Sequence, residues 1–128
     1  MNIFGIGSDL VNIKRIQGIL KRNRNFKNRV FSKKEIVIGS KKNNQSNYFA
    51  KRFAAKEAFS KALGTGISKG IYFKEIVILN KKSGKPYINI IGQTKKILKK
   101  KFKKKKIKVS LSIADEKKYA AAFVTITL

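Results

Sequence analysis

"FAAKEAFSKALGTG", residues 53–66, carries the strongest helix signal in this chain. Together with the preceding "YFAKR" it is rich in Ala and other strong helix formers, and Gly64 suits the left-handed conformation on which many helices end. The stretch therefore predicts a long helix that stops at Gly64. On such a helix Phe53, Glu57 and Lys61 share one stripe, so Glu57 would lie near the edge of the core.

Strand and helix patterns precede this helix. A Gly-containing apolar run at 2–7 predicts a strand, followed by a helix in "SDLVNIKRIQGILKR", residues 8–22. Ser32 and Glu35 form a capping-box pattern that starts another helix and accounts for Glu35 without any chemistry. The polar stretch 40–47 predicts a surface loop.

The second half of the chain predicts two strand pairs around a helix. "EIVIL" (75–79) and "YINII" (87–91) flank a turn that holds the single Pro of the sequence. A lysine-rich helix is expected at 94–106, before the strands "IKVSLSI" (107–113) and "YAAAFVTITL" (119–128). Hairpins interleaved with helices indicate an α+β fold, a mostly antiparallel sheet packed with helices. We expect a single small domain over 1–128.

The net charge of +26 arises from 32 basic and six acidic side chains. Such a charge attracts polyanions, which favours nucleic acid or an acidic protein as a partner. A second explanation is compositional, because the 27 Lys, 18 Ile and 10 Asn residues all have AT-rich codons. Charge alone therefore assigns no nucleic-acid role. The 42% hydrophobic content, with nine Phe and four Tyr, predicts a folded domain rather than a disordered basic tail.

The sequence contains no Cys and no His, which excludes disulfides, thiolate nucleophiles and imidazole bases or ligands. Catalysis would then depend on carboxylates, lysines, hydroxyls, the backbone or a metal ion. No apolar run approaches the about 20 residues that span a bilayer, and no signal-peptide pattern is present. We expect a cytoplasmic protein without a membrane partner.

Two acidic positions each have a structural and a chemical interpretation. Asp9 follows the first predicted strand and would cap the next helix, or it would bind Mg²⁺, which prefers carboxylate, water and phosphate oxygens. Glu57 and Lys61 have the i,i+4 spacing of a helical ion pair, whereas a carboxylate at the core edge also suits a metal. The Gly-rich stretches match neither a dinucleotide fingerprint nor a P-loop. The lysine run 95–106 is typical of a solvated helix face.

Three stretches together resemble the holo-acyl-carrier-protein synthase family of 4′-phosphopantetheinyl transferases. They are "GIGSDLVNIKRI" near the start, "KRFAAKEAFSKALGTGI" in the middle, and "SGKPYI" followed by "VSLSIADEKKYAAAFV". The resemblance implies the fold of that family. It also implies transfer of 4′-phosphopantetheine from coenzyme A to a serine of apo-acyl carrier protein, releasing adenosine 3′,5′-bisphosphate and supporting fatty acid biosynthesis.

The resemblance assigns roles residue by residue. Asp9 and Glu57 match the family's Mg²⁺ ligands, and with Lys61 they would form the catalytic set. The positions that match coenzyme A contacts are Arg52, Lys61, Gly66 and Lys85. Arg15 and Phe26 match contacts to the acidic carrier protein.

The serine proton needs an acceptor, and without His the candidates are Glu57 and a Mg²⁺-bound water. The water is favoured, because a carboxylate that binds the metal is a weaker base. Many relatives have His at the position of Asp115, which locally is a turn residue. The resemblance further implies a homotrimer with active sites between subunits. An alternative from a different functional class is a non-catalytic RNA- or ribosome-binding protein. The sequence lacks the strand pattern of aromatic and basic residues that is usual in RNA-binding domains.

Overall fold

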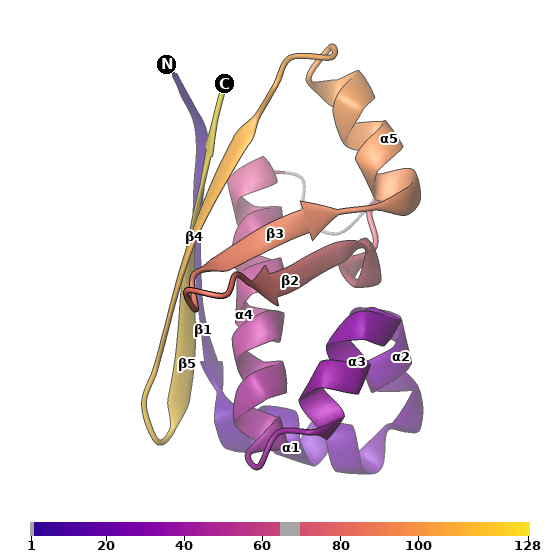
Figure 1. Cartoon of the computed structure of the whole chain (residues 1–128), viewed down its shortest axis with the longest axis vertical. Coiled ribbons are helices and arrows are strands. Elements are labelled where there is room, and N and C mark those ends of the chain that lie inside the picture. The colour runs from indigo at the N-terminus through magenta and orange to yellow at the C-terminus, as the bar shows by residue number, and fades with distance from the viewer. Residues whose placement is uncertain (1, 65–69) are drawn as a thin grey trace.

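Helix α4 (Gln45–Leu63) lies against one face of a three-stranded antiparallel sheet in the order β1-β5-β4 (Figure 1). The strands are β1 (Ile3–Asn12), β5 (Tyr119–Thr127) and β4 (Lys108–Asp115). This computed structural model describes residues 2–64 and 70–128. The helix ends as the sequence predicts, because Gly64 is its C-cap with φ +79°.

Glycine in β1 and alanine in α4 allow this helix to approach the sheet closely. A Cβ added to Gly5 or Gly7 would lie 1.9 Å from the carbonyl oxygen of Ala62 or Ala58, respectively. No side chain fits between backbones at that separation, so both positions require glycine. The "GIG" of the first strand and the "AAKEAFSKA" of the helix are therefore complementary surfaces.

The remaining elements lie on the same side of the sheet as α4 (Figure 1). They are the helices α1 (Ile13–Arg22), α2 (Arg24–Val30), α3 (Lys33–Ser40) and α5 (Gly92–Lys101), the 3₁₀ turn η1 (Phe73–Glu75), and the hairpin of β2 (Ile76–Asn80) and β3 (Pro86–Ile90). In the hairpin Asn80 pairs with Pro86 and Ile76 with Ile90. The predicted α+β architecture with mostly antiparallel strands is confirmed. None of the described helices is long and apolar enough to cross a membrane.

A buried ion pair fixes this hairpin against α4. Lys56 and Glu35 have fully buried side chains, and Lys56 Nζ donates to Glu35 Oε1 over 2.8 Å. The same ammonium donates to the carbonyls of Phe73 (2.8 Å) and Ile76 (2.7 Å). Glu35 Oε2 accepts from the backbone N–H of Ile78 at 3.1 Å. These bonds join α3, α4, η1 and β2 at one point.

The structure corrects the interpretation of Glu35. The capping box exists, since Ser32 Oγ accepts from Glu35 N–H and Glu35 Oε1 accepts from Ser32 N–H. Capping α3 is not the only role of Glu35, because its carboxylate also binds Lys56. A partner 21 residues away along the chain gives no local signal.

The structure also corrects three predicted boundaries. Strand β1 continues to Asn12, whose side chain caps α1, so the helix predicted from residue 8 begins at Ile13 and Asp9 is no N-cap. Helix α4 begins at Gln45, inside the loop predicted at 40–47, and α2 was not predicted. Helix α5 ends at Lys101 rather than at 106, because Lys103 and Lys104 have φ of 51° and 65°.

Candidate functional site

Asp9 and Lys61 meet where β1 crosses α4. Asp9 pairs with Ala122 of β5, and its carboxylate lies on the face of the sheet that α4 covers. Lys61 Nζ donates to Asp9 Oδ1 at 3.1 Å and to the carbonyl of Ser8 at 3.0 Å. The Asp9 side chain is 16% exposed and that of Lys61 is 55% exposed. The pair therefore lies at the surface with its carboxylate partly covered.

Glu57 lies half-buried one turn before Lys61 on α4, at the core edge that its helical stripe predicts. Burial raises the pKa of its carboxyl, and the charge of Asp9 raises that pKa further, while Lys61 and Arg15 act in the opposite direction. The ion pair between Glu57 and Lys61, one of the two interpretations of their spacing, is not formed. The ion pairs of the described residues are Lys56–Glu35 and Lys61–Asp9, so Lys61 reaches across to β1 instead.

The donor set of Asp9 and Glu57 fits a hard divalent cation. Two carboxylates that repel each other at a partly covered position are stabilised by a cation between them, and Mg²⁺ takes one or two protein carboxylates with water and substrate phosphate. In the part of the chain that the structure describes, no cluster of three or more Asp, Glu, His or Cys side chains exists. The described residues therefore form no site in which protein side chains alone surround a metal. Asp9 and Glu57 suit a site in which substrate phosphate and water supply the remaining ligands.

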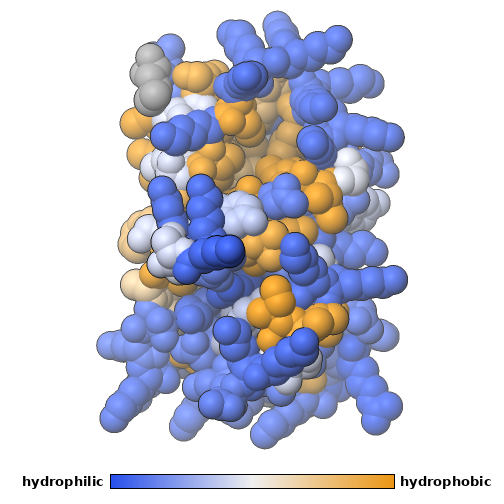
Figure 2. Space-filling model, in the orientation of Figure 1, coloured by the Kyte–Doolittle hydropathy of each residue, from blue (hydrophilic) through white to orange (hydrophobic). Residues whose placement is uncertain are grey.

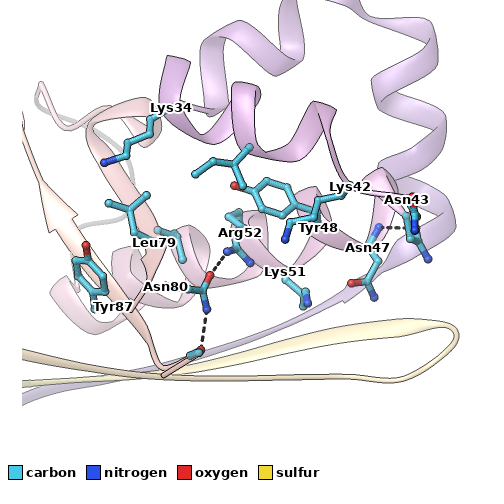
Figure 3. A pocket seen from close by; sticks show the side chains of 14 residues that line it. Lys34, Lys42, Asn43, Asn47, Tyr48, Lys51, Arg52, Leu79, Asn80 and Tyr87 are labelled. Atoms are coloured by element: carbon cyan, nitrogen blue, oxygen red, sulfur yellow. Dashed lines mark hydrogen bonds between the residues drawn. The ribbon is translucent and has the colours of Figure 1, made fainter. Parts of the chain in front are cut away.

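A second polar site lies at the other end of α4. A cavity of about 650 Å³ opens between α3, α4 and the β2–β3 hairpin (Figure 3). Four cationic side chains line it, namely Lys34, Lys42, Lys51 and Arg52, together with Asn43, Asn44, Asn47, Asn80, Tyr48 and Tyr87 among its polar and aromatic groups. No acidic side chain lines the cavity, so it suits an anion carrying nucleobase-sized apolar surface.

Arg52 is held firmly at the floor of this cavity. It is 6% exposed, its guanidinium lies 4.1 Å from the ring centroid of Tyr48, and its Nη2 donates to Asn80 Oδ1. Asn80 in turn donates to the carbonyl of Gly84 at 2.9 Å, as Figure 3 shows. This chain of contacts ties α4 to the turn of the hairpin.

Two buried donors beside the cavity have no hydrogen-bond partner among the described residues. They are the Tyr48 hydroxyl and Arg52 Nε. Burial raises the pKa of Tyr48, and the nearby Glu35 carboxylate adds to the rise, while Arg52 opposes it. The hydroxyl thus keeps its proton. Unsatisfied buried donors are rare in proteins, and these two are available to an acceptor.

The other predicted site residues fall in several places. Lys85 is exposed in the hairpin turn beside Gly84, and Arg15 is exposed on α1 near enough to influence Glu57. Phe26 is half-buried on α2, with its ring 5.9 Å from that of Phe53. Gly66 lies outside the described residues. The structure therefore brings Asp9, Glu57, Lys61 and Arg15 together, whereas Arg52 and Lys85 belong to the cavity region.

Sequence reasoning missed most of the cavity. Lys34, Lys42, Lys51, Tyr48 and Asn80 carry no motif, although the polar run at 40–47 was a hint that was interpreted only as a loop. Asp115 is also more than a turn residue. It ends β4, and its Oδ2 accepts from Asn47 Nδ2 at 2.7 Å, which joins the sheet to the first turn of α4 beside the cavity.

Comparison with known proteins shows which chains this one is similar to in sequence and fold. The chain is 50% identical over 124 residues to a holo-[acyl-carrier-protein] synthase of Pelagibacter ubique, covering 97% of this chain and 96% of that one. The holo-[acyl-carrier-protein] synthase of Neisseria meningitidis has a similar structure, with a TM-score of 0.87, 37% identity and coverage of 99% and 100%. The Helicobacter pylori synthase, solved in complex with coenzyme A, matches with a TM-score of 0.79 and 35% identity, over 95% of this chain and 99% of that one. Since residues 5–124 also match the family described as the 4′-phosphopantetheinyl transferase superfamily, the chain belongs to that family.

Proposed function

We propose that this protein is a holo-acyl-carrier-protein synthase, which transfers 4′-phosphopantetheine from coenzyme A to a serine of apo-acyl carrier protein. The observation that carries the proposal is the convergence of Asp9, Glu57 and Lys61 at the crossing of β1 and α4. This convergence occurs in a chain that is similar along nearly its full length to proteins of that name. The activity would serve fatty acid biosynthesis.

Coenzyme A would place its nucleotide in the cavity of Figure 3. Lys34, Lys42, Lys51 and Arg52 supply positive charge for its phosphates, and Lys85 stands nearby on the hairpin turn. Phosphate oxygens are acceptors, so they match the unpartnered donors of Tyr48 and Arg52. The relative from Helicobacter pylori binds the same molecule.

Asp9 and Glu57 would hold Mg²⁺, with phosphate oxygens of coenzyme A and water completing its shell. A bound Mg²⁺ supplies stabilisation of negative charge on the phosphate oxygens. The Lys61 ammonium, more than half exposed, can leave Asp9 and turn toward the pyrophosphate. Lys61 would then offset the charge that develops on the leaving adenosine bisphosphate.

The group transfer forms one bond and breaks one bond at phosphorus. The serine hydroxyl oxygen of the carrier protein bonds to the phosphorus that bears pantetheine, and the bond from that phosphorus to the bridging pyrophosphate oxygen breaks. Adenosine 3′,5′-bisphosphate leaves with the electron pair, and the serine proton passes to water. Arg15, which is exposed on α1, would receive the acidic carrier protein, with Phe26 on the adjacent helix α2 as an apolar contact.

We further propose that the chain assembles as a homotrimer through the uncovered face of the β1-β5-β4 sheet. On that face Ile6 and Leu10 are each 66% exposed and Phe123 is 55% exposed, which is unusual in a chain of net charge +26. Asp9 and Glu57 do not line the cavity that holds Arg52. A neighbouring subunit that brings its own cavity to this pair would complete the site.

A mass-shift assay tests the reaction. Incubation of the protein with coenzyme A, Mg²⁺ and apo-acyl carrier protein should add one phosphopantetheine to the carrier. Asp9→Asn and Glu57→Gln should each lower the rate by orders of magnitude while circular dichroism stays unchanged. A folded, Mg²⁺-loaded protein that adds no mass would refute the proposal.

Light scattering tests the assembly. The wild type should have three times the chain mass, and Phe123→Lys should give a folded protein of one chain mass with little activity. A wild type that runs as one chain while fully active would refute the trimer.

A further inference from the structure

Helix α5 and the turn after it form a surface of lysines, none of which pairs with an acidic side chain among the described residues. Between Ile76 and Ala114 the sequence has 13 Lys and no acidic residue. Five of these lysines line a hollow of about 540 Å³, and we call them the α5 lysine surface: Lys96, Lys99, Lys100, Lys103 and Lys104. Figure 2 shows hydrophilic side chains gathered over the α5 end of the molecule.

The backbone after α5 concentrates these charges. Lys104 N–H donates to the carbonyl of Lys99 at 2.9 Å and Lys103 N–H to that of Lys100 at 3.1 Å, which is the bonding pattern of a Schellman turn. Glycine usually occupies the left-handed position of such a turn, but here Lys103 and Lys104 both have positive φ. The turn thus folds two lysines back beside those of the helix at the expense of backbone strain.

No lysine of this surface forms an ion pair with a described residue, although Lys99 and Lys100 in the last turn of α5 interact favourably with the helix dipole. The ion pairs within 2–64 and 70–128 involve Lys56 and Lys61, and neither includes a residue of the α5 lysine surface. Lys96 and Lys100 are like charges at i,i+4 within α5. Such pairs repel and destabilise a helix. A polyanion bound at this surface would remove that repulsion.

The apolar side of α5 is buried against the rest of the protein, and this burial bears on which kind of polyanion the lysines could bind. Leu98 is 4% exposed and Phe102 is 6% exposed, and Ile97 packs against the core. The helix therefore has no apolar face left to insert into a lipid bilayer. It offers point charges alone, which match regularly spaced phosphates.

We propose that the α5 lysine surface binds the phosphate backbone of nucleic acid, independently of sequence and of catalysis. The α5 lysine surface includes neither Asp9 nor Glu57 and no residue of the cavity around Arg52, and α5 and α1 lie at opposite ends of the molecule in Figure 1. Carrier protein at α1 and nucleic acid at α5 would then occupy different surfaces of one chain.

Salt dependence tests this proposal quantitatively. The probe is a fluorescein-labelled 20-base-pair DNA duplex, titrated at 50 to 200 mM KCl. Five neutralised phosphates contribute about −4.5 to the slope of log Kobs against log[salt], or about 500-fold in affinity over that range. The variant with Lys→Gln at all five positions should lose this contribution and retain transferase activity in the mass-shift assay.

A matched control removes the same charge elsewhere. Lys→Gln at the five exposed positions Lys33, Lys41, Lys74, Lys117 and Lys118 should leave most of the slope intact. Equal losses in both variants would overturn the proposal, since they would mark attraction by net charge alone. Retained DNA binding by the α5 variant, or binding of the wild type to vesicles with anionic lipid but not to DNA, would also overturn it.

A single substitution separates charge from folding. Lys103→Gly removes one cation and relieves positive φ, so it should raise the melting temperature while reducing the slope by about 1. A slope unchanged in this stabilised variant would contradict the role of the turn. Because transferase activity is measured on the same samples, failure of this proposal and failure of the proposed function give different results.

Discussion

Lys56→Met removes the ammonium at the centre of the buried network that joins α3, α4, η1 and β2. The substitution leaves the Glu35 carboxylate, which is fully buried, without its 2.8 Å partner. It also leaves the carbonyls of Phe73 and Ile76 without a donor. Removing one partner of a buried ion pair costs about 3–5 kcal/mol, and a Met side chain fills much of the vacated volume. We therefore expect the free energy of unfolding to fall by about 3–5 kcal/mol.

Urea denaturation followed by circular dichroism measures this loss. Lys51→Met, also on α4 but only half-buried, serves as the control and should change stability by about 0.5 kcal/mol or less. The double variant Glu35→Leu/Lys56→Met should be less destabilised than the sum of its single variants, because it leaves no buried charge behind. A loss below about 1 kcal/mol in Lys56→Met would refute the role assigned to the network.

The pH dependence of this network has a defined sign. Burial lowers the pKa of Lys56 from 10.5 to about 8, against the attraction of Glu35. Between about pH 8 and 10.5 the unfolded chain binds this proton and the folded chain does not, so folding stability contributed by this group increases as pH rises through that window. Lys56→Met should lack this component. If the free energies of unfolding of wild type and Lys56→Met change equally between pH 8 and 10, the titration of Lys56 does not contribute to folding stability in this range.

Three further predictions follow from other contacts. Burial and the charge of Asp9 raise the pKa of Glu57, so the charged form of this carboxylate opposes folding near neutral pH. Glu57→Gln should therefore leave the melting temperature equal or higher, and it should abolish any rise in melting temperature that Mg²⁺ causes. A Mg²⁺ effect that calorimetry finds unchanged in Glu57→Gln would count against the metal role. Burial is the largest single effect on the Glu75 carboxyl and raises its pKa, but the bonds from Thr94 and Gln93 together outweigh burial and lower the pKa. The stability that this carboxylate gives is therefore present above about pH 4.5 and is lost as pH falls. Glu75→Gln should reduce this loss of stability at acid pH by about 1 kcal/mol, measured by urea denaturation at a series of pH values. An equal loss in wild type and variant would show that the cap of α5 does not depend on charge. Gly7→Ala should unfold the protein or destabilise it by several kcal/mol, because its Cβ would meet the Ala58 carbonyl at 1.9 Å. Gly18→Ala on α1 should be neutral or stabilising, because its Cβ would meet only the Arg22 side chain, at 3.6 Å. A stable Gly7→Ala protein would mean that β1 and α4 can move apart.

The parts of the fold that the sequence predicted are those with local causes. Alanine-rich composition and Gly64 define α4 within one stretch, and the turn between β2 and β3 is marked by Gly84 and Pro86. Asp9 shows where local signals fail. "SDLVN" reads equally as a helix start or a strand, and pairing of Asp9 with Ala122, more than 100 positions away, selects the strand.

The candidate site was predictable only in part for the same reason. Asp9, Glu57 and Lys61 were named through a resemblance, and their meeting depends on the approach of β1 to α4. The cavity around Arg52 collects side chains from α3, α4 and the hairpin, which no motif links. Lys56 was unnoticed, because its burial and its bond to Glu35 are properties of the assembled core.

Helix α4 connects these features and explains their spacing. Its alanine face lies on Gly5 and Gly7, which brings Asp9 of β1 to Lys61 and Glu57. One position before Glu57, Lys56 points to a different side of the helix and binds the hairpin, and one turn earlier Arg52 binds Asn80 of that hairpin. A shift of α4 along the sheet would therefore disturb the carboxylate pair and the cavity at once. This coupling is the physical reason to expect that Gly7 and Lys56, neither of which contacts substrate, limit activity as strictly as they limit stability.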